Sequence, residues 1–383
     1  MTTIDEFASA KLASLEDKGL RRALKGTDRY GDTAVRRNRR EMISFCCNDY
    51  LNLSHHPDVI AAAHTATDRY GTGSGGSRLI SGNTPLYEFL ESGLAAFKGT
   101  EAALVFGSGY LTNIGVIPCF AGPADLIIAD ELNHACLFAG SRLSGATMLT
   151  YKHGDAAACE ALLQEHRSNA RHCLIITDGV FSMDGDIAPI AALSELAHQF
   201  DAWLMVDDAH GLGTVGAGRG SVQACQPSYP VALQMGTLSK SAGAYGGYLC
   251  ASQAVIDFVT NRARSFVYST GLPPATLAAA IAAIDIMATE TEICFVPINN
   301  ATYFCDKLGL PRPESPIVPL IVGDADTVMT ASQGLEERGF LVTGIRPPTV
   351  PEGTARLRFT FTAEHSIDDI DRLIDALRDM NLV

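Results

Sequence analysis

A single lysine, Lys240, lies in a segment of small residues after a short apolar run, and its amine is the group that we expect to do chemistry. Residues 230–235 form the apolar run, which predicts a short buried strand. Gly236 and Thr237 follow it, and no carboxylate lies near Lys240 in the sequence. A lysine that loses hydration without an anionic partner becomes neutral more easily, and a neutral amine forms a Schiff base with an aldehyde. The alternative is a solvated lysine on a glycine- and serine-rich loop.

Other side chains that could take part in catalysis or ligand binding follow further apolar runs. The runs 125–130, 173–178 and 203–207 lead to His134, to Ser182, and to Asp207 with His210. Strands buried on both faces have this pattern, and helix-length segments such as 190–200 separate the runs. The pattern predicts an α/β fold with a mainly parallel sheet and helices on both faces. Ligands of such sheets bind beyond the carboxyl ends of the strands, where these side chains would converge.

The combination matches the needs of pyridoxal phosphate (PLP): an imine-forming lysine, a carboxylate, a stacking ring and a phosphate cup. Lys240 would hold the aldehyde, and Asp207 would pair with the pyridine nitrogen. His210 would reach the phenolic oxygen of the ring, and His134 would lie flat on the ring. Gly109 and Tyr110, at the strand-to-helix turn after residues 102–106, would bind the phosphate together with Thr237, and Ser182 would lie near the ring. Each residue also has a purely structural alternative, since histidines after strands are often satisfied core residues and aspartates there often cap helices.

Composition restricts the class of protein. The chain has 383 residues, 47% hydrophobic and 19% charged residues, and a formal charge of −14, which argues against a nucleic-acid binder. No apolar run is long enough to cross a bilayer, and the N-terminus does not resemble a secretory signal, so we expect a cytoplasmic enzyme. The ten cysteines are scattered without a C-x-x-C pair, which favours reduced thiols and no metal site.

We expect three parts: a helical, basic segment (1–45), a large cofactor-binding α/β domain (46–275) and a small α+β domain (276–383). Between Lys11 and Arg40, ten lysines and arginines stand against four acidic residues. They form either a solvated amphipathic helix or a landing site for an anionic substrate. A helix should start at Thr84–Pro85 and end at Gly99, and an alanine-rich helix should span about 276–290.

The chain resembles the α-oxoamine synthases, a group of fold-type I PLP enzymes, over nearly its whole length. The most discriminating match is residues 345–351 together with 353–358, which are similar to the branch of the family that works in biotin biosynthesis. The other matching stretches are residues 48–51, 73–77, 179–186, 206–211 and 237–240. Residues 241–245 depart from the commoner glycine-rich version of the family, which leaves the details of that loop open.

The resemblance implies condensation of L-alanine with a pimeloyl thioester, carried on CoA or on acyl carrier protein, with loss of CO2. It implies that the freed amine of Lys240 removes the α-proton and that His134 stabilises an oxyanion or donates a proton. The catalytic residues would be Lys240, His134, Asp207 and His210. The same resemblance assigns substrate contacts to Arg21, Asn48, His134 and Thr349, and we take Arg346 as the candidate for the amino-acid carboxylate. Ser269 and Thr270 resemble the segment that reaches the neighbouring subunit's phosphate, which implies a homodimer.

Three alternatives remain at this point. A sister enzyme (glycine C-acetyltransferase, 5-aminolevulinate synthase or serine palmitoyltransferase) would share the same core. A non-catalytic partner subunit would keep the fold without the chemistry, although the joint presence of Lys240, Asp207 and His210 argues against it. An NAD enzyme is disfavoured because no G-x-G-x-x-G follows a first strand.

Overall fold

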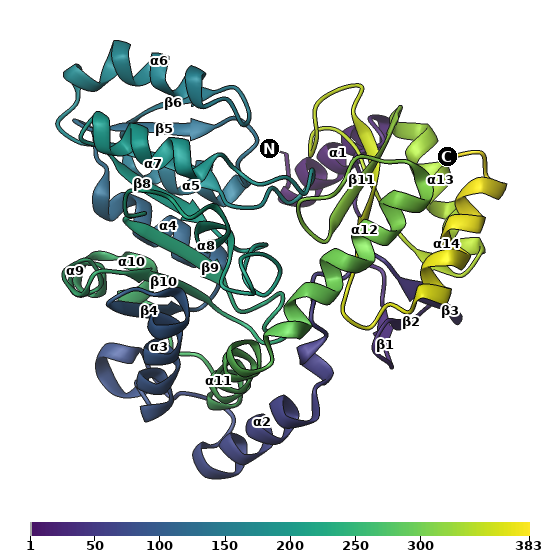
Figure 1. Ribbon diagram of the computed structural model, residues 1–383, viewed down its shortest axis with the longest axis horizontal. Helices are drawn as coiled ribbons and strands as arrows, with labels where there is room; N and C mark the ends of the chain where they lie inside the picture. Colours follow the sequence, from purple (N-terminus) through teal and green to yellow (C-terminus); the bar gives the residue numbers. More distant parts are fainter. Residues whose placement is uncertain (1) are drawn as a thin grey trace.

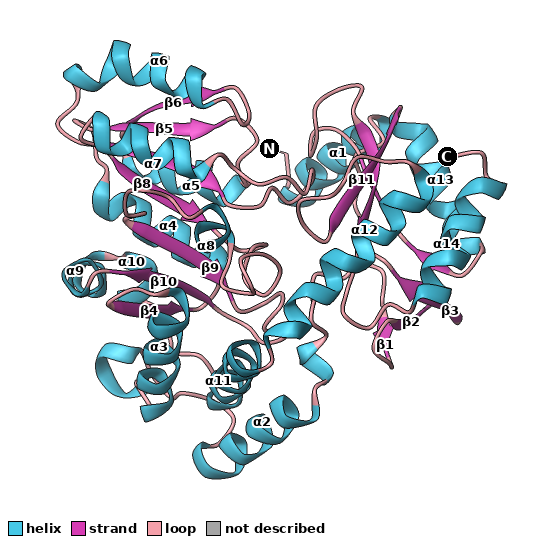
Figure 2. Cartoon of the chain, viewed as in Figure 1, coloured by secondary structure: helices cyan, strands magenta, loops and turns pink. Residues whose placement is uncertain are grey.

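The computed structural model describes residues 2–383, and a seven-stranded sheet lies at the centre of its larger part (Figures 1 and 2). Strands β9, β8, β7, β5 and β6 run parallel, whereas β10 is antiparallel to both of its neighbours. The predicted mainly parallel sheet is therefore confirmed. In spatial order the strands are β4 (Ala102–Phe106), β10 (Gly247–Ala251), β9 (Leu233–Thr237), β8 (Trp203–Asp207), β7 (Cys173–Asp178), β5 (Leu126–Asp130) and β6 (Thr147–Tyr151).

Alternation of apolar side chains decides which face of the sheet each residue covers. Ala103 and Val105 of β4 pack on one face, whereas Leu104 and Phe106 pack on the other. Both faces are covered by helices, so β5, β7, β9 and β10 are buried at every position. The helices of this part are α2 (Pro57–Tyr70), α3 (Pro85–Lys98), α4 (Gly109–Phe120), α5 (Ala135–Ser144), α6 (Ala156–His166), α7 (Ile190–Gln199), α8 (Ser221–Cys225), α9 (Gln253–Arg262), α10 (Arg264–Val267) and α11 (Pro274–Thr289), with the short helices η1 (Leu53–His55), η2 (Arg78–Gly82) and η3 (Arg167–Asn169).

Helix α3 shows how the local signals set the boundaries. Pro85 occupies its first turn, and Gly99 ends it with a φ of 71°, a left-handed conformation that glycine adopts without strain. Both predicted ends are confirmed. Thr84 caps the helix only through its backbone, because its side chain makes no capping hydrogen bond. The predicted alanine-rich helix is α11, which packs against α2 and α3.

A second body contains the C-terminal residues and the N-terminal strands (Figure 1). Its core joins Phe45 to side chains of the C-terminal helices and strands. Strand β3 pairs in parallel with β12, so residues far apart in sequence share one small sheet. The elements are β1 (Asp28–Arg29), β2 (Ala34–Arg37), β3 (Arg40–Ser44), β11 (Ile317–Gly323), β12 (Phe340–Leu341), β13 (Thr343–Ile345), β14 (Ala355–Thr360), η4 (Thr291–Phe295), α12 (Val296–Leu308), α13 (Ala325–Glu337) and α14 (Ile367–Asp379).

The basic N-terminal segment is not one helix. Helix α1 (Ile4–Asp17) ends before most of the basic residues, none of its residues is buried, and Arg36 and Arg37 lie in β2. The amphipathic-helix interpretation is therefore wrong for the residues after Asp17. The division of the chain at residues 45 and 275 stays a prediction. Within residues 2–383 no helix combines the length and the apolarity that a membrane span requires.

Candidate active site

A cavity of 270 Å³ opens at the carboxyl ends of the central parallel strands, next to the N-terminus of α4. Most of the residues predicted from the sequence line it, although they come from six separate stretches of the chain. The predicted residues in its wall are Asn48, Gly109, Tyr110, His134, Ser182, Asp207, His210, Thr237 and Lys240. The remaining wall is formed by Cys136, Asp178, Val180, Ala209, Met235 and Ser239.

Five predicted residues do not line this cavity. Arg21 is exposed and forms an ion pair with Glu16. Thr270, next to Ser269, pairs with Ser77 of the glycine-rich loop in an isolated bridge. Arg346 and Thr349 lie after β13, outside the cavity wall. The roles of Arg21, Ser269, Thr270, Arg346 and Thr349 stay predictions.

Lys240 follows β9 and is partly buried at the cavity. Burial lowers the pKa of its amine to about 8, and the charges of Asp207 and Asp178 oppose this shift. The prediction that Lys240 has no carboxylate nearby is therefore wrong for the folded protein, because the fold brings Asp207 and Asp178 near it. The outcome is still an amine that is partly neutral near physiological pH.

Asp207, at the end of β8, is 4% exposed and is oriented by two donors. Asn113 of α4 donates through Nδ2 to Asp207 Oδ2 over 2.7 Å, and the backbone N–H of Ala209 donates to Oδ1 over 3.0 Å. These bonds fix the plane of the carboxylate in the cavity wall. A carboxylate whose plane is fixed is preorganised to accept a hydrogen bond from a ring nitrogen.

His134 is the N-cap residue of α5, and this position orients its ring. Its backbone N–H donates to Asp178 Oδ2 over 3.0 Å, and the N–H of Cys136 donates to His134 Nδ1 over 3.3 Å. The Cys136 Sγ lies 2.7 Å from the same nitrogen. Because Nδ1 is the acceptor of the cap, the proton of the neutral ring lies on Nε2. Burial and the charge of Lys240 lower the pKa of His134, and Asp207 opposes them, so the imidazole is neutral.

His210 is held by a buried tyrosine that the sequence analysis did not identify. The Tyr50 hydroxyl lies 2.7 Å from His210 Nδ1, and both side chains are buried. Burial raises the pKa of Tyr50 to about 12, so it is a protonated donor. The pKa of His210 lies well below its ordinary value because of burial and the nearby charges of Lys240 and Arg358. The neutral ring therefore accepts at Nδ1 and donates from Nε2.

The N-terminus of α4 forms a cup for an anion. Ser108 caps the helix by accepting from the N–H of Leu111 over 3.2 Å. In residues 2–383 the N–H groups of Gly109 and Tyr110 have no intramolecular acceptor, and both residues line the cavity with Thr237 and Ser239. A Cβ on Gly109 would lie 3.0 Å from Met235 Cε, so glycine suits this close approach. Free N–H groups at a helix N-terminus bind phosphate.

Two buried arginines of β14 reach the loop that carries Ser182. Arg358 is 5% exposed, and its Nε donates to Ser182 O over 2.5 Å while its Nη atoms lie 3.3 and 3.4 Å from Asn48 Oδ1. Arg356 forms an ion pair with Asp184 and also donates to Met183 O. Unlike Arg356, Arg358 has no carboxylate partner within residues 2–383, and its charge acts on Lys240 and His210. It is thus a buried cation beside the cavity that lacks an anion.

Comparisons with known proteins agree with this geometry. Residues 40–377 match the aminotransferase class I and II family. A serine palmitoyltransferase from Sphingomonas wittichii has a TM-score of 0.92 at 30% identity, with 99% of this chain and 98% of that chain covered. A serine palmitoyltransferase from S. paucimobilis with a bound PLP–myriocin aldimine has a TM-score of 0.91 at 27% identity, with the same coverage. The fold is that of the fold-type I PLP enzymes.

Curated relatives narrow the family further. The 8-amino-7-oxononanoate synthases of Beijerinckia indica and Methylobacterium nodulans are 55% and 54% identical over 377 and 378 residues, and each match covers at least 97% of both chains. The crystal structure of 8-amino-7-oxononanoate synthase from Francisella tularensis has a TM-score of 0.76 at 27% identity, with 89% of this chain and 98% of that chain covered. The chain belongs to the 8-amino-7-oxononanoate synthase family of aminotransferase class I and II proteins.

Proposed function

We propose that this protein condenses L-alanine with a pimeloyl thioester to give 8-amino-7-oxononanoate, CO2 and the free thiol, a step of biotin biosynthesis, with PLP as its cofactor. Similarity to the 8-amino-7-oxononanoate synthases over nearly the whole chain supports the reaction. The observation that carries it is the cavity in which Lys240 lies with Asp207, His134 and the N-terminus of α4.

The residues present fit the cofactor. Lys240 would hold its aldehyde, the Asp207 carboxylate its ring nitrogen, His210 Nε2 its phenolic oxygen, and the free N–H groups of Gly109 and Tyr110 its phosphate. Bound PLP supplies an electron sink for the carbanion that forms at the α-carbon of the amino acid.

Lys240 is the base. Its amine has a pKa of about 8, which places it near the pH at which a general base combines availability with proton affinity. It would take the α-proton of L-alanine and return a proton to the product carbon. The charges of Asp207 and Asp178 keep that pKa from falling further, so the amine can still hold the proton between the two steps.

His134 would act at the thioester. A neutral ring with its proton on Nε2 is a hydrogen-bond donor that is aimed by its cap before substrate arrives. Such a preorganised donor stabilises the oxyanion that develops on the thioester carbonyl when the new carbon–carbon bond forms. The low pKa of His134 makes it a donor rather than a strong acid.

Arg358 is a second candidate, beside Arg346, for the amino-acid carboxylate. It is buried next to the cavity, it has no acidic partner among residues 2–383, and its charge is felt at Lys240. A guanidinium binds a carboxylate in a bidentate manner, and burial makes that bond stronger. The carboxylate would thus lie close to the carbon that Lys240 deprotonates.

The acyl carrier and the assembly belong to the same proposal. The exposed basic residues of the N-terminal segment, such as Arg21 and Arg22, would meet the phosphates of CoA or of acyl carrier protein. A homodimer would bring the Ser269–Thr270 segment to the neighbouring cofactor phosphate. Large exposed side chains of the adjoining segments, Ile80 and Tyr268 among them, are consistent with coverage by a second copy.

A substrate panel tests the function. Thiol release and product mass would be measured with L-alanine, glycine and L-serine, each against pimeloyl-, acetyl-, succinyl- and palmitoyl-CoA and pimeloyl-acyl carrier protein. We expect 8-amino-7-oxononanoate only from L-alanine with a pimeloyl donor. The palmitoyl and L-serine arms are needed because serine palmitoyltransferases have the higher TM-scores. A better rate with L-serine and palmitoyl-CoA would replace the assignment.

A further inference from the structure

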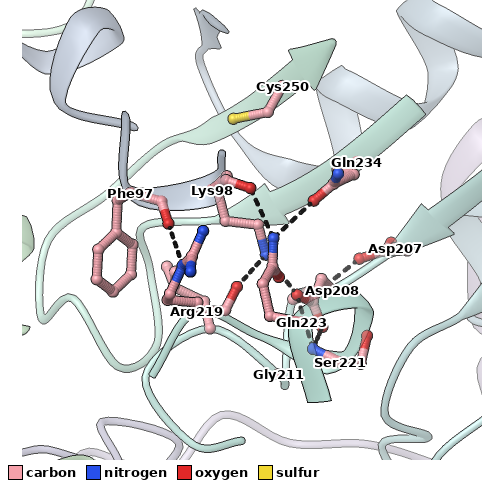
Figure 3. A network of polar contacts seen from close by, with 12 residues as sticks. Phe97, Lys98, Asp207, Asp208, Gly211, Arg219, Ser221, Gln223, Gln234 and Cys250 are labelled. Atoms are coloured by element: carbon pink, nitrogen blue, oxygen red, sulfur yellow. Dashed lines mark hydrogen bonds and ion pairs between the residues drawn. The ribbon is translucent and has the colours of Figure 1, made fainter. Parts of the chain in front are cut away.

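A fully buried ion pair joins Lys98 to Asp208, the residue that follows Asp207 (Figure 3). The Lys98 Nζ lies 2.7 Å from Asp208 Oδ2, and both side chains have 0% exposure. Lys98 is the last residue of α3, and Asp208 follows Asp207 at the end of β8. Consecutive residues of an extended chain point to opposite sides. Asp207 therefore faces the cavity while Asp208 faces α3.

The carboxylate of Asp208 is enclosed by backbone. It accepts from the N–H of Ser221 over 2.9 and 3.1 Å. A Cβ on Gly211 or on Gly220 would lie 1.8 or 1.7 Å from its oxygens, so glycine is required at both positions. Lys98 also donates to Arg219 O over 2.5 Å, which ties the far end of the same loop to α3. The pair thus closes the loop 208–220 on itself.

This loop carries His210 and begins directly after Asp207. The N–H groups of Gly211 and Leu212 donate to Asp208 O, which forms a tight turn around His210. Asp208 is bonded through its own N–H to Met235 O of β9 over 2.7 Å. A shift of Asp208 would therefore move Asp207 on one side and His210 on the other. Binding groups of this kind must be held to about 0.5 Å.

We infer that Lys98 is a positioning residue for the cofactor: through Asp208 it fixes the turn that aims Asp207 and His210. The inference rests on the proposed function, because it concerns the cofactor that those residues hold. A pair that served only the stability of the fold would not affect how tightly the cofactor is retained. Lys98 itself lies outside the cavity wall and would touch neither cofactor nor substrate.

The test compares the holoenzymes of Lys98→Met, Asp208→Asn and the double variant. Release of PLP on dilution, the visible absorption band and the melting temperature would be measured for each. We expect PLP release to be about 10- to 100-fold faster in both single variants, as for the loss of an outer-shell partner of a metal ligand, with a displaced absorption band. The double variant should recover melting temperature relative to the single variants, because no buried charge is left unpaired, but not cofactor retention.

Gln223→Met provides the matched control. Gln223 donates to the backbone oxygen of Lys98 over 2.6 Å in the same network, and within residues 2–383 it makes no hydrogen bond to Asp208 (Figure 3). We expect this variant to lose some melting temperature and to keep its cofactor as the wild type does. A Lys98→Met enzyme that melts earlier but retains PLP with an unchanged band would overturn the inference, and so would a Gln223→Met enzyme that releases PLP equally fast. A wild-type protein without a borohydride-fixed adduct on Lys240 would overturn the proposed function and the inference together.

Discussion

Asp178 and Asp207 are register partners at the carboxyl ends of the parallel strands β7 and β8. When two carboxylates are buried side by side in a region of low dielectric, ionisation of both has a high free-energy cost. Burial, followed by the charge of Asp207, raises the pKa of Asp178 well above its ordinary value. Asp178 Oδ2 also accepts from the backbone N–H of His134, so this carboxyl group acts on Asp207 through its charge and holds the backbone of His134.

Replacement of Asp178 by asparagine should change the pH dependence of stability. A carboxyl whose folded-state pKa is raised contributes stability that is complete below about pH 4 and is lost as the pH rises through the folded-state pKa. Asp178→Asn keeps an acceptor for His134 N–H and cannot ionise. Its melting temperature should therefore rise relative to the wild type as the pH increases above about 4. The exposed Asp379→Asn is the control, and parallel curves for wild type and Asp178→Asn would contradict the shift.

The amine of Lys240 should capture its cofactor with a pH midpoint set by burial. Only the neutral amine attacks the aldehyde, and the pKa of Lys240 is about 8. Stopped-flow absorbance of the apoenzyme mixed with PLP should show a rate that rises with pH and levels off above that value. A free lysine would continue to gain rate up to about pH 10.4. Lys240→Ala should give no borohydride-stable adduct, and a midpoint near that of free lysine would refute the desolvated site.

His134 caps α5 through Nδ1 and would donate a hydrogen bond from Nε2, and substitution by asparagine or by glutamine separates these two roles. Asparagine can cap α5 in place of Nδ1 but has no donor at the position of Nε2. Glutamine can place an amide N–H near that position but does not cap. We expect His134→Asn to keep the melting temperature and lose kcat with pimeloyl-CoA by about 100-fold or more, as when an oxyanion donor is removed.

His134→Gln should lose about 1 kcal/mol of unfolding free energy through the missing cap and retain more of kcat than His134→Asn. Thermal unfolding and steady-state kinetics at one pH distinguish the pair. The reverse order of the two kcat values would show that the ring acts through Nδ1 or by stacking alone.

Arg358 and Arg346 are the two candidates for binding the carboxylate of L-alanine, and each assignment predicts a different effect of substitution on KM. If Arg358 holds L-alanine, Arg358→Gln should raise KM for L-alanine by about 100-fold, since a charge-assisted bond of about 3 kcal/mol is lost. Arg346→Gln should then leave that KM within about twofold, because Arg346 lies outside the cavity wall. Initial rates against L-alanine concentration, with melting temperature as a check of folding, decide between them. A large effect at Arg346 alone would restore the sequence-based choice.

The sequence identified side chains that follow an apolar strand directly. Asp207, His210, Ser182 and Lys240 come at or shortly after strand ends, and parallel topology brings such positions together. Asp178 ends the run 173–178 and carries the same signal, although it is not among the predicted site residues.

Partners that come from distant elements gave no such signal. Asn113 lies inside α4 and Tyr50 precedes η1, and nothing local shows that they reach Asp207 and His210. Arg358 alternates with apolar residues along β14, a pattern typical of a strand with one solvent face, yet both faces of β14 are buried. The Lys98–Asp208 pair joins residues 110 positions apart, and only the three-dimensional fold reveals it.

The contacts of β14 with the loop of Ser182 and Asp184 restrict which relatives of this enzyme can be recombined. Ser182 lies in the cavity wall, and its loop is held by Arg358 and Arg356 from the C-terminal third of the chain, so the wall depends on contacts between two distant segments. In a hybrid gene that joined about the first 300 codons of one relative to the remainder of another, the two arginines and the loop that they contact would come from different parents. Recombination should therefore succeed only between parents whose loop and strand still match, and the two segments should be exchanged as a unit.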